Sequence, residues 1–304
     1  MDNKNINLKH EQIKLMLISA TFGTIGFVMH FIPLSSPATV FYRALIGGLF
    51  IIIMCLISNK IIDIKSMKDN FFILVLTAFF MGLNWVFQFE AFKVSSVAIG
   101  TVCYNTMPIF LLIIASFVFK EKITIKNIIC ISIATIGIIL VSNVIYTGIK
   151  SNEVLGCVYG IIGAILYALI VIYNRKLSDI ATHDKIIFQF MFSSIIMAIY
   201  VLLIQKKTLL FDANLDEKTY IIGLISLITL CLFHTGFCYV HYFNAVSHLK
   251  AETVAIMTYI DPVVALLLSY FVLKEKTTGL QMLGAVLILA STLINQLVGN
   301  KKQL

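Results

Sequence analysis

Long apolar runs separated by short polar intervals dominate this chain. Ten of the runs have roughly the 17–25 residues that an α-helix needs to cross a hydrocarbon core of about 30 Å. The longest polar interval, residues 205–218, leaves no room for a soluble catalytic domain. The pattern predicts ten membrane-spanning helices, at residues 15–33, 37–58, 71–92, 95–119, 125–143, 154–174, 185–204, 219–246, 250–273 and 278–298.

Composition agrees with a membrane protein. Hydrophobic residues make up 60% of the 304 residues and charged residues only 12%, against about 25% charged in a soluble domain. The net charge of +8 is spread over lysines between the apolar runs, with no basic stripe, which excludes nucleic acid as a partner. All six cysteines fall inside apolar runs without a C-x-x-C pair, so we expect buried thiols rather than disulfides.

The distribution of Lys and Arg predicts the orientation, because cytoplasmic loops carry the excess of these residues. With the N-terminus inside, the inner segments hold fifteen of them and the outer loops seven. We therefore expect both termini to be cytoplasmic. The bias is strong in the first five predicted spans and weak in the last five.

An internal repeat appears when the chain is shifted by 154 residues. Between residues 89 and 122 the shift gives nine identities in 34 positions. They include Pro108 on Pro262 and a Lys-Glu-Lys run at residues 120–122 on the same run at residues 274–276. Each copy has five predicted spans, an odd number, so the second copy enters the membrane from the opposite side. The sequence predicts two inverted five-helix repeats, residues 1–150 and 151–304.

These features resemble the ten-helix, EamA-type members of the drug/metabolite transporter superfamily. The residues that carry the resemblance are Ser36, Pro37 and Arg43 in the second span, the Phe-x-Ala ends of the third and eighth spans, Pro108 and Pro262, the two Lys-Glu-Lys exits, and YALIVIYNRK at residues 167–176. The resemblance covers nearly the whole chain. It implies a substrate cavity lined by helices of both halves, and it leaves the substrate open among amino acids, amines, sugars and other metabolites.

Asp261 is the deepest ionisable residue, eleven residues into the ninth predicted span and directly before Pro262. Charged side chains at this depth are costly and mark solute or ion pathways. Because proline removes a backbone donor, carbonyl groups one turn earlier are left to meet a ligand, ion or water. We expect Asp261 to bind an ammonium group or to carry a coupling proton. The alternative is a structural carboxylate at a helix kink. The equivalent residue of the first copy is Met107.

Polar and aromatic residues of both halves are candidates for the cavity wall. They suit stacking on an aromatic group or cation–π contact with a cationic head, although each alone is also typical of membrane-interface or helix-packing positions. The candidates for substrate binding are Asp261, Tyr259, Trp85, Asn84, Gln88, Asn105, Tyr104, Tyr239, Tyr242 and Tyr167.

Further polar residues lie within predicted spans. For Arg43 we expect a structural role, paired with Glu90, with a substrate carboxylate as the other partner considered. His234 is a second candidate for proton coupling, since imidazole titrates near neutral pH. His234, Cys238 and His241 have the spacing of metal ligands on one helix face, but no fourth ligand joins them. We therefore predict no metal site. For Pro108 and Pro262 we expect structural roles.

The sequence thus predicts an all-α secondary transporter of the plasma or inner membrane. It moves a small organic solute, an amino acid or amine, by alternating access, and protons are a candidate coupling ion. It contains no nucleotide-binding or catalytic motif, so we expect neither enzyme activity nor a cofactor. The alternatives are a membrane-embedded enzyme or lipid-handling protein and a passive channel. As partners we expect the solute and the bilayer, with the protein a monomer or homodimer.

Overall fold

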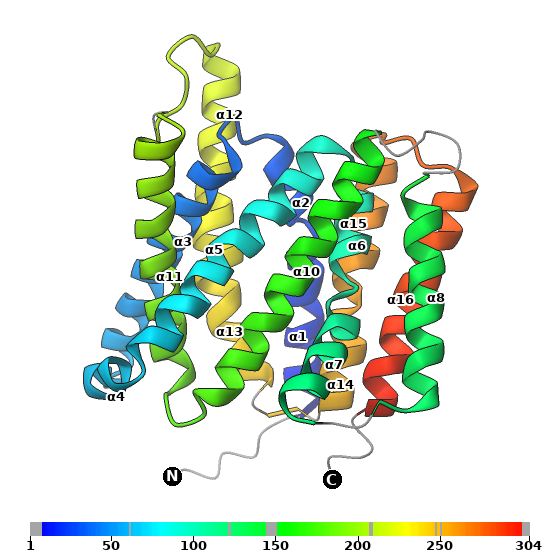
Figure 1. The fold of residues 1–304 in the computed structure, drawn as a ribbon. Helices are drawn as coiled ribbons and strands as arrows, with labels where there is room; N and C mark the ends of the chain where they lie inside the picture. The colour runs from blue at the N-terminus through cyan, green and yellow to red at the C-terminus, as the bar shows by residue number, and fades with distance from the viewer. Residues whose placement is uncertain are drawn as a thin grey trace.

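Helices and the turns between them make up the chain in a computed structural model (Figure 1), which describes residues 8–60, 62–120, 123–143, 151–206, 209–246, 248–249 and 251–299. Within these residues there is no strand. The α-helices are α1 (Leu8–Gly23), α2 (Ile25–His30), α3 (Ser36–Ile57), α4 (Ile64–Asp69), α5 (Phe71–Val94), α6 (Val97–Tyr104), α7 (Met107–Val118), α8 (Ile125–Val141), α10 (Asn152–Lys176), α11 (Thr182–Ile199), α12 (Glu217–Ile228), α13 (Cys238–Val246), α14 (Ala251–Thr258), α15 (Ile260–Phe271) and α16 (Gly279–Gly299). Two π-helical segments, η1 (Tyr200–Ile204) and η2 (Thr229–Phe237), continue α11 and α12.

Seven helical stretches are long and apolar enough to cross a membrane, which confirms a multi-pass helical membrane protein. They are Leu8–His30, Ser36–Ile57, Phe71–Val94, Val97–Val118, Asn152–Lys176, Thr182–Ile204 and Glu217–Val246. Three shorter apolar helices, Ile125–Val141, Ile260–Phe271 and Gly279–Ser291, occupy the places of the fifth, ninth and tenth predicted spans. Large apolar side chains such as Phe72, Phe117 and Leu203 are exposed on the outside of the bundle. That arrangement suits lipid rather than water as the surrounding medium.

Short polar side chains fix where several helices begin. Ser35 caps α3, and Pro37 in the first turn supplies a backbone angle that suits a helix start. Ser96 caps α6 by accepting a hydrogen bond from the Ile99 N–H at 3.1 Å. Thr124 and Asn127 form a capping box at the start of α8. These caps satisfy N–H groups that have no partner within the helix.

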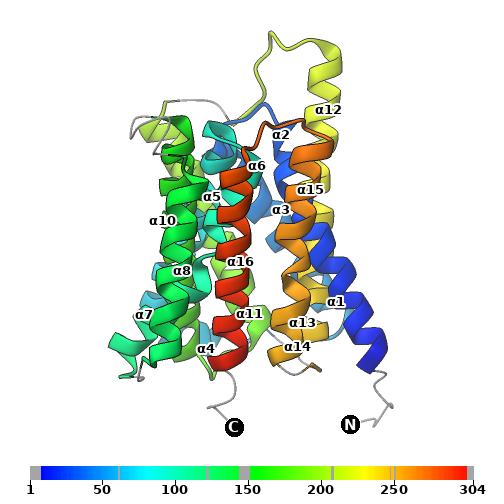
Figure 2. The same ribbon diagram turned by 90° about the vertical axis from the view of Figure 1, so that its right-hand side faces the viewer.

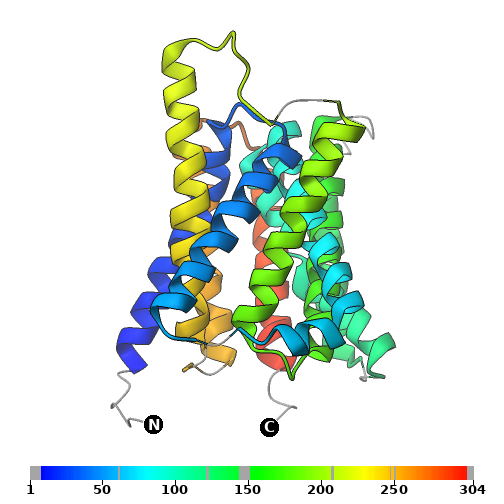
Figure 3. The same cartoon turned by 90° about the vertical axis from the view of Figure 1, so that its left-hand side faces the viewer.

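The packing of the helices repeats between the two halves of the chain. α10 packs against α5, α6 and α7, while α1 packs against α13, α14 and α15. α3 packs against α11, and α8 packs against α16. Figure 2 shows α16 and α8 on one side of the bundle, and Figure 3 shows α3 and α11 on the opposite side. The first long helix of each half therefore contacts the helices of the other half.

Two spans that the sequence predicts as continuous are broken. The predicted span 95–119 divides into α6 and α7 at Asn105 and Thr106, and the predicted span 250–273 divides into α14 and α15 at Tyr259. The cause is the proline three residues after each break position, Pro108 and Pro262, because neither supplies an N–H to the carbonyl four residues earlier. Asn105 and Tyr259 are themselves 154 residues apart, so the breaks lie at equivalent positions of the repeat.

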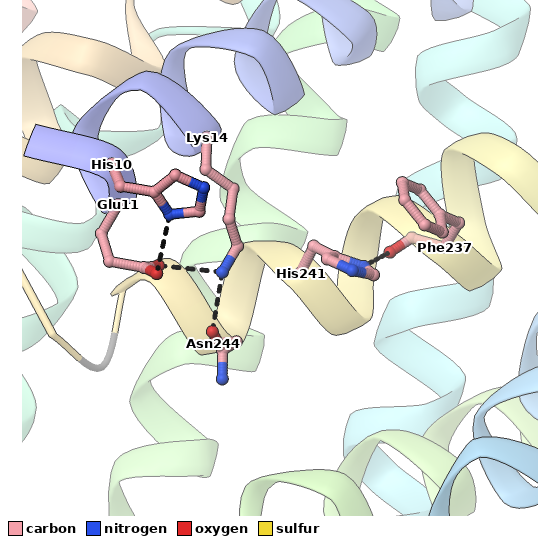
Figure 4. A network of polar contacts seen from close by, with 6 residues as sticks. All are labelled: His10, Glu11, Lys14, Phe237, His241 and Asn244. Carbon is pink, nitrogen blue, oxygen red and sulfur yellow. Dashed lines mark hydrogen bonds and ion pairs between the residues drawn. The ribbon is translucent and has the colours of Figure 1, made fainter. Parts of the chain in front are cut away.

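At the end of the bundle where α1 begins, polar side chains join α1 to α13 (Figure 4). The Lys14 Nζ donates to Glu11 Oε2 at 2.9 Å and to Asn244 Oδ1 at 2.8 Å. His10 lies 3.5 Å from the other Glu11 oxygen, and His241 Nδ1 lies 3.0 Å from the Phe237 carbonyl. These contacts are partly exposed, so each contributes only about 0–1 kcal/mol.

Glycine permits the close approach of α8 and α16. A Cβ atom added to Gly284 would lie 2.6 Å from the Gly137 carbonyl oxygen and 2.8 Å from the Leu140 Cβ. A Cβ added to Gly137 would lie 2.8 Å from the Gly284 carbonyl oxygen. Backbone atoms cannot rotate away, so the two helices remain in this contact only with glycine at both positions.

We predict that Gly284→Ala pushes α16 away from α8 and destabilises the protein by about 1–3 kcal/mol. Gly279→Ala in the same helix is the control, because nothing lies within 4 Å of its added Cβ. Thermal unfolding in detergent should show a lower Tm for Gly284→Ala alone. Equal Tm values for the two variants would contradict the close packing of α8 and α16.

Candidate functional site

A cavity of about 420 Å³ lies in the middle of the bundle, and both halves of the chain contribute to its wall. Its size falls within the range of about 300–1,000 Å³ that is typical of small-molecule sites. Nine of the ten predicted binding residues line it, namely Trp85, Gln88, Tyr104, Asn105, Tyr167, Tyr239, Tyr242, Tyr259 and Asp261. Arg43 and Pro108, to which the sequence assigns structural roles, also line it.

Both helix breaks open into this cavity. Asn105, Met107 and Pro108 represent the first break, and Thr258, Tyr259 and Asp261 represent the second. Irregular backbone at membrane depth is tolerated only where it is covered by protein or lines a polar cavity. The position of the cavity therefore follows from the two breaks.

Asp261 lies in the first turn of α15, where the helix dipole stabilises a negative charge. Its side chain is half-buried, and it forms no hydrogen bond or ion pair with any residue that the structure describes. Gly23 of α1 brings the backbone close, since a Cβ there would lie 2.4 Å from the Asp261 carbonyl oxygen. The backbone of Asp261 is thus packed closely against α1, while its carboxylate has no counterion among the described residues.

Arg43 of α3 is 2% exposed and is held by aromatic and hydroxyl groups. Its Nε donates to Thr235 Oγ1 at 3.0 Å. Its guanidinium carbon lies 4.1 Å from the ring centroid of Trp85 and 5.4 Å from that of Phe89. Its Nη1 is buried without a hydrogen-bond partner, and the ion pair with Glu90 is not formed. The arginine is instead stabilised by cation–π contacts and by a hydrogen bond with the Tyr239 side chain.

Aromatic side chains from five helices support one another around the cavity. The ring of Tyr239 packs at 5.5 Å from that of Phe190 and 5.6 Å from that of Phe22. The rings of Tyr104 and Tyr167 lie 6.2 Å apart. These edge-to-face contacts restrict the rotamers of the wall, so the cavity keeps a defined shape.

Asn84 and His234 lie outside the cavity wall. The Asn84 Nδ2 donates to the Gly163 carbonyl at 2.7 Å and to the Tyr104 hydroxyl at 3.3 Å. The second hydrogen bond fixes the position of the Tyr104 side chain. His234 lies in η2 with Nε2 2.7 Å from Thr24 Oγ1 and Nδ1 3.2 Å from the Thr229 carbonyl. Among the described residues no three His, Cys, Asp or Glu side chains are grouped to hold a metal ion.

Polar residues on α10 and α11, which are not among the residues predicted from the sequence, also line the cavity. Gln189 Nε2 donates to Asn174 Oδ1 at 2.7 Å and to Thr77 Oγ1 at 3.0 Å. Lys185 donates to the Leu177 carbonyl at 3.1 Å. The signal that would have found Gln189 is an amide in the middle of an apolar span, the same signal that identified Gln88.

The wall includes residues at the start of α11, which lies at the end of the bundle where α1 begins and α16 ends (Figure 1). Thr182 and Lys185, at the start of α11, lie on this side. A second cavity of about 560 Å³ is lined by residues of α3, α11 and α13 and shares Thr182, Ile186 and Tyr239 with the first. Together the two cavities lead from the mid-bundle charges to one end of the protein.

Comparison with known proteins identifies the family. The profile of the EamA-like transporter family matches residues 11–143 and again residues 154–296. The chain belongs to the EamA-like transporter family. It is a multi-pass protein of the cell membrane, and family membership assigns it to membrane transport of a small molecule.

Individual relatives agree with this assignment. An uncharacterized transporter, YxxF, of Bacillus subtilis (strain 168) is 26% identical over 281 residues, covering 91% of this chain and 86% of the relative. An uncharacterized transporter of Clostridium kluyveri is 22% identical over 264 residues, covering 85% and 82%. A solved crystal structure aligns over 96% of this EamA-like chain and 98% of its own with a TM-score of 0.64 and 12% identity, which shows a shared fold.

We predict that Thr235→Val destabilises the protein by about 1–3 kcal/mol, because it removes the acceptor of Arg43 Nε and leaves a further buried donor unpaired. Thr229→Val is the matched control, since the Thr229 hydroxyl forms an exposed hydrogen bond, and only with its own helix at the Ile225 carbonyl. Chemical or thermal unfolding of the purified variants measures the difference. A Thr235→Val protein as stable as the control would show that this hydrogen bond does not hold Arg43.

Proposed function

We propose that this EamA-like protein is a secondary transporter that moves an amino acid or an amine across the cell membrane by alternating access. The observation that carries the proposal is the central cavity, in which an unpaired Asp261 and a set of aromatic rings meet at two helix breaks. A carboxylate surrounded by aromatic faces suits a solute with an ammonium group, which gains both charge pairing and cation–π contact.

The transport cycle that we propose rests on two inverted five-helix repeats with cytoplasmic termini. The separate matches of the family profile to residues 11–143 and 154–296 support the repeat. The equivalent helix breaks and the reciprocal packing of α1 and α10 on the opposite halves support the inversion. In such folds, rocking of one half against the other exposes a central site first to one side of the membrane and then to the other.

Contacts at the end of the bundle opposite the α1 start support a closed state there. The Glu275 carboxylate accepts hydrogen bonds from the Val97 N–H at 3.1 Å to each oxygen, and it also accepts one from the Ser269 hydroxyl. Lys93 donates to the Leu34 carbonyl at 2.5 Å. Glu275 belongs to the second half and caps a helix of the first half, so we propose that this contact breaks when the solute site opens to that side.

We propose Asp261 as the group that couples transport to protons. It lines the cavity and has no fixed partner, so a proton and a solute ammonium group can compete for it. His234, the other candidate, is 2% exposed and lies away from the wall with partners at both ring nitrogens. A structural role that joins η2 to Thr24 suits it better.

The test replaces Asp261 with asparagine, which keeps the shape of the side chain and removes its charge. The transported solute is first identified by thermal shift of the purified protein against amino acids, amines and nucleosides, because a ligand of the folded state raises the Tm. In proteoliposomes, we predict that Asp261→Asn lowers solute flux to background and abolishes its response to a pH gradient. Asp69→Asn, on the exposed helix α4, should behave as the wild type. Wild-type flux from Asp261→Asn at normal protein levels would refute the assigned role.

A further inference from the structure

Two opposite charges line the central cavity, and neither is neutralised by the protein. Asp261 and Arg43 both belong to the wall, yet they form no ion pair with each other or with another described residue. A buried guanidinium without a counterion is strongly disfavoured, and aromatic faces replace only part of the stabilisation that water or a carboxylate provides. The missing partner is therefore expected from outside the protein.

The surroundings of Arg43 leave one side of the guanidinium for that partner. Trp85 covers one face of the planar group at 4.1 Å, and Thr235 Oγ1 accepts a hydrogen bond from Nε. The Nη1 group is buried without an acceptor. The Tyr239 side chain also hydrogen-bonds to the guanidinium. An arginine held in this way presents its remaining N–H groups as a fork, which matches the two oxygens of a carboxylate.

Tyrosine side chains line the cavity together with the two charges. Tyr104 and Tyr239 share the wall with Arg43 and Asp261, and the Tyr239 side chain hydrogen-bonds to Arg43. Both tyrosines are held in place, Tyr104 by Asn84 and Tyr239 by its ring contacts with Phe22 and Phe190. A solute that carries a positive and a negative group would lie along these side chains with each charge facing its opposite.

We propose that Arg43 is the anion-binding group of the solute site, so that the solute carries a carboxylate for Arg43 as well as an ammonium group for Asp261. This inference rests on the proposed transport function and narrows its substrate class from amines and amino acids to zwitterionic amino acids. It also assigns Arg43 a binding role in place of the structural role suggested by the sequence.

The test compares matched probes that differ by one charged group. Each of the protein amino acids is measured beside the amine that lacks its α-carboxylate, by thermal shift and isothermal titration on the purified full-length wild type. At least one amino acid should bind about tenfold to a hundredfold more tightly than its decarboxylated amine, the change expected for a charge-assisted pair. An amine that binds as tightly as its parent amino acid, or the absence of any amino acid that binds, overturns the proposal.

A variant pair then assigns the carboxylate to Arg43. Arg43→Lys keeps the positive charge but loses the fork and should remove most of the preference for the amino acid over its amine. Arg175→Lys is the control, because Arg175 also stacks on an aromatic ring, that of Phe119 at 4.4 Å, but lies on the exposed end of α10. Because the first comparison uses the wild type, poor folding of Arg43→Lys does not affect it.

The outcome for Arg43 is distinguishable from that for transport as a whole. If amines alone bind, and if their flux depends on Asp261, the transporter proposal stands and the role of Arg43 is refuted. If a folded Arg43→Lys protein still prefers the amino acid over its amine to the same extent, another group binds the carboxylate. If neither amino acids nor amines bind and no flux is found, both proposals fail.

Discussion

Every backbone polar group in the middle of a membrane needs a partner, and this constraint explains the arrangement of the whole molecule. Pro108 and Pro262 each prevent a continuous helix, which places irregular backbone at the centre of the bundle. Such backbone is stable only where protein covers it or where it borders a polar cavity. The breaks, the cavity and the contacts of the first helix of each half are consequences of this single requirement.

The charged groups lie along the cavity because the free-energy cost of burying a charge is lowest in this part of the bundle. Asp261 lies at the start of α15, where the helix dipole favours a carboxylate. Arg43 lies across aromatic rings that offset part of the cost of its burial. Glycines such as Gly23 then allow α1 to close over the break, since a side chain there would collide with the Asp261 carbonyl. The same positions thus determine both the charged groups of the cavity and the packing of the helices around it.

The sequence predicted the cavity wall better than its surroundings. Spacing by 154 residues relates Asn105 to Tyr259 and Pro108 to Pro262, so one half of the chain helps to locate the site in the other. The position of Asn84 was not predictable, because it depends on α10. The Gly163 carbonyl of that helix accepts a hydrogen bond from the Asn84 amide. His234 lies in a π-helical segment that the sequence did not predict, and the wider turn changes the face on which each side chain lies.

Alternating access by this protein requires that the two halves lie in opposite directions across the membrane. Single cysteines at Lys126 and Lys276, both exposed and at opposite ends of the bundle, test it, since all six native cysteines are buried. In intact cells a membrane-impermeant maleimide should label Lys276→Cys, whereas Lys126→Cys should react only after the cells are permeabilised. Labelling of both positions from the same side would contradict an inverted repeat and the alternating-access cycle built on it.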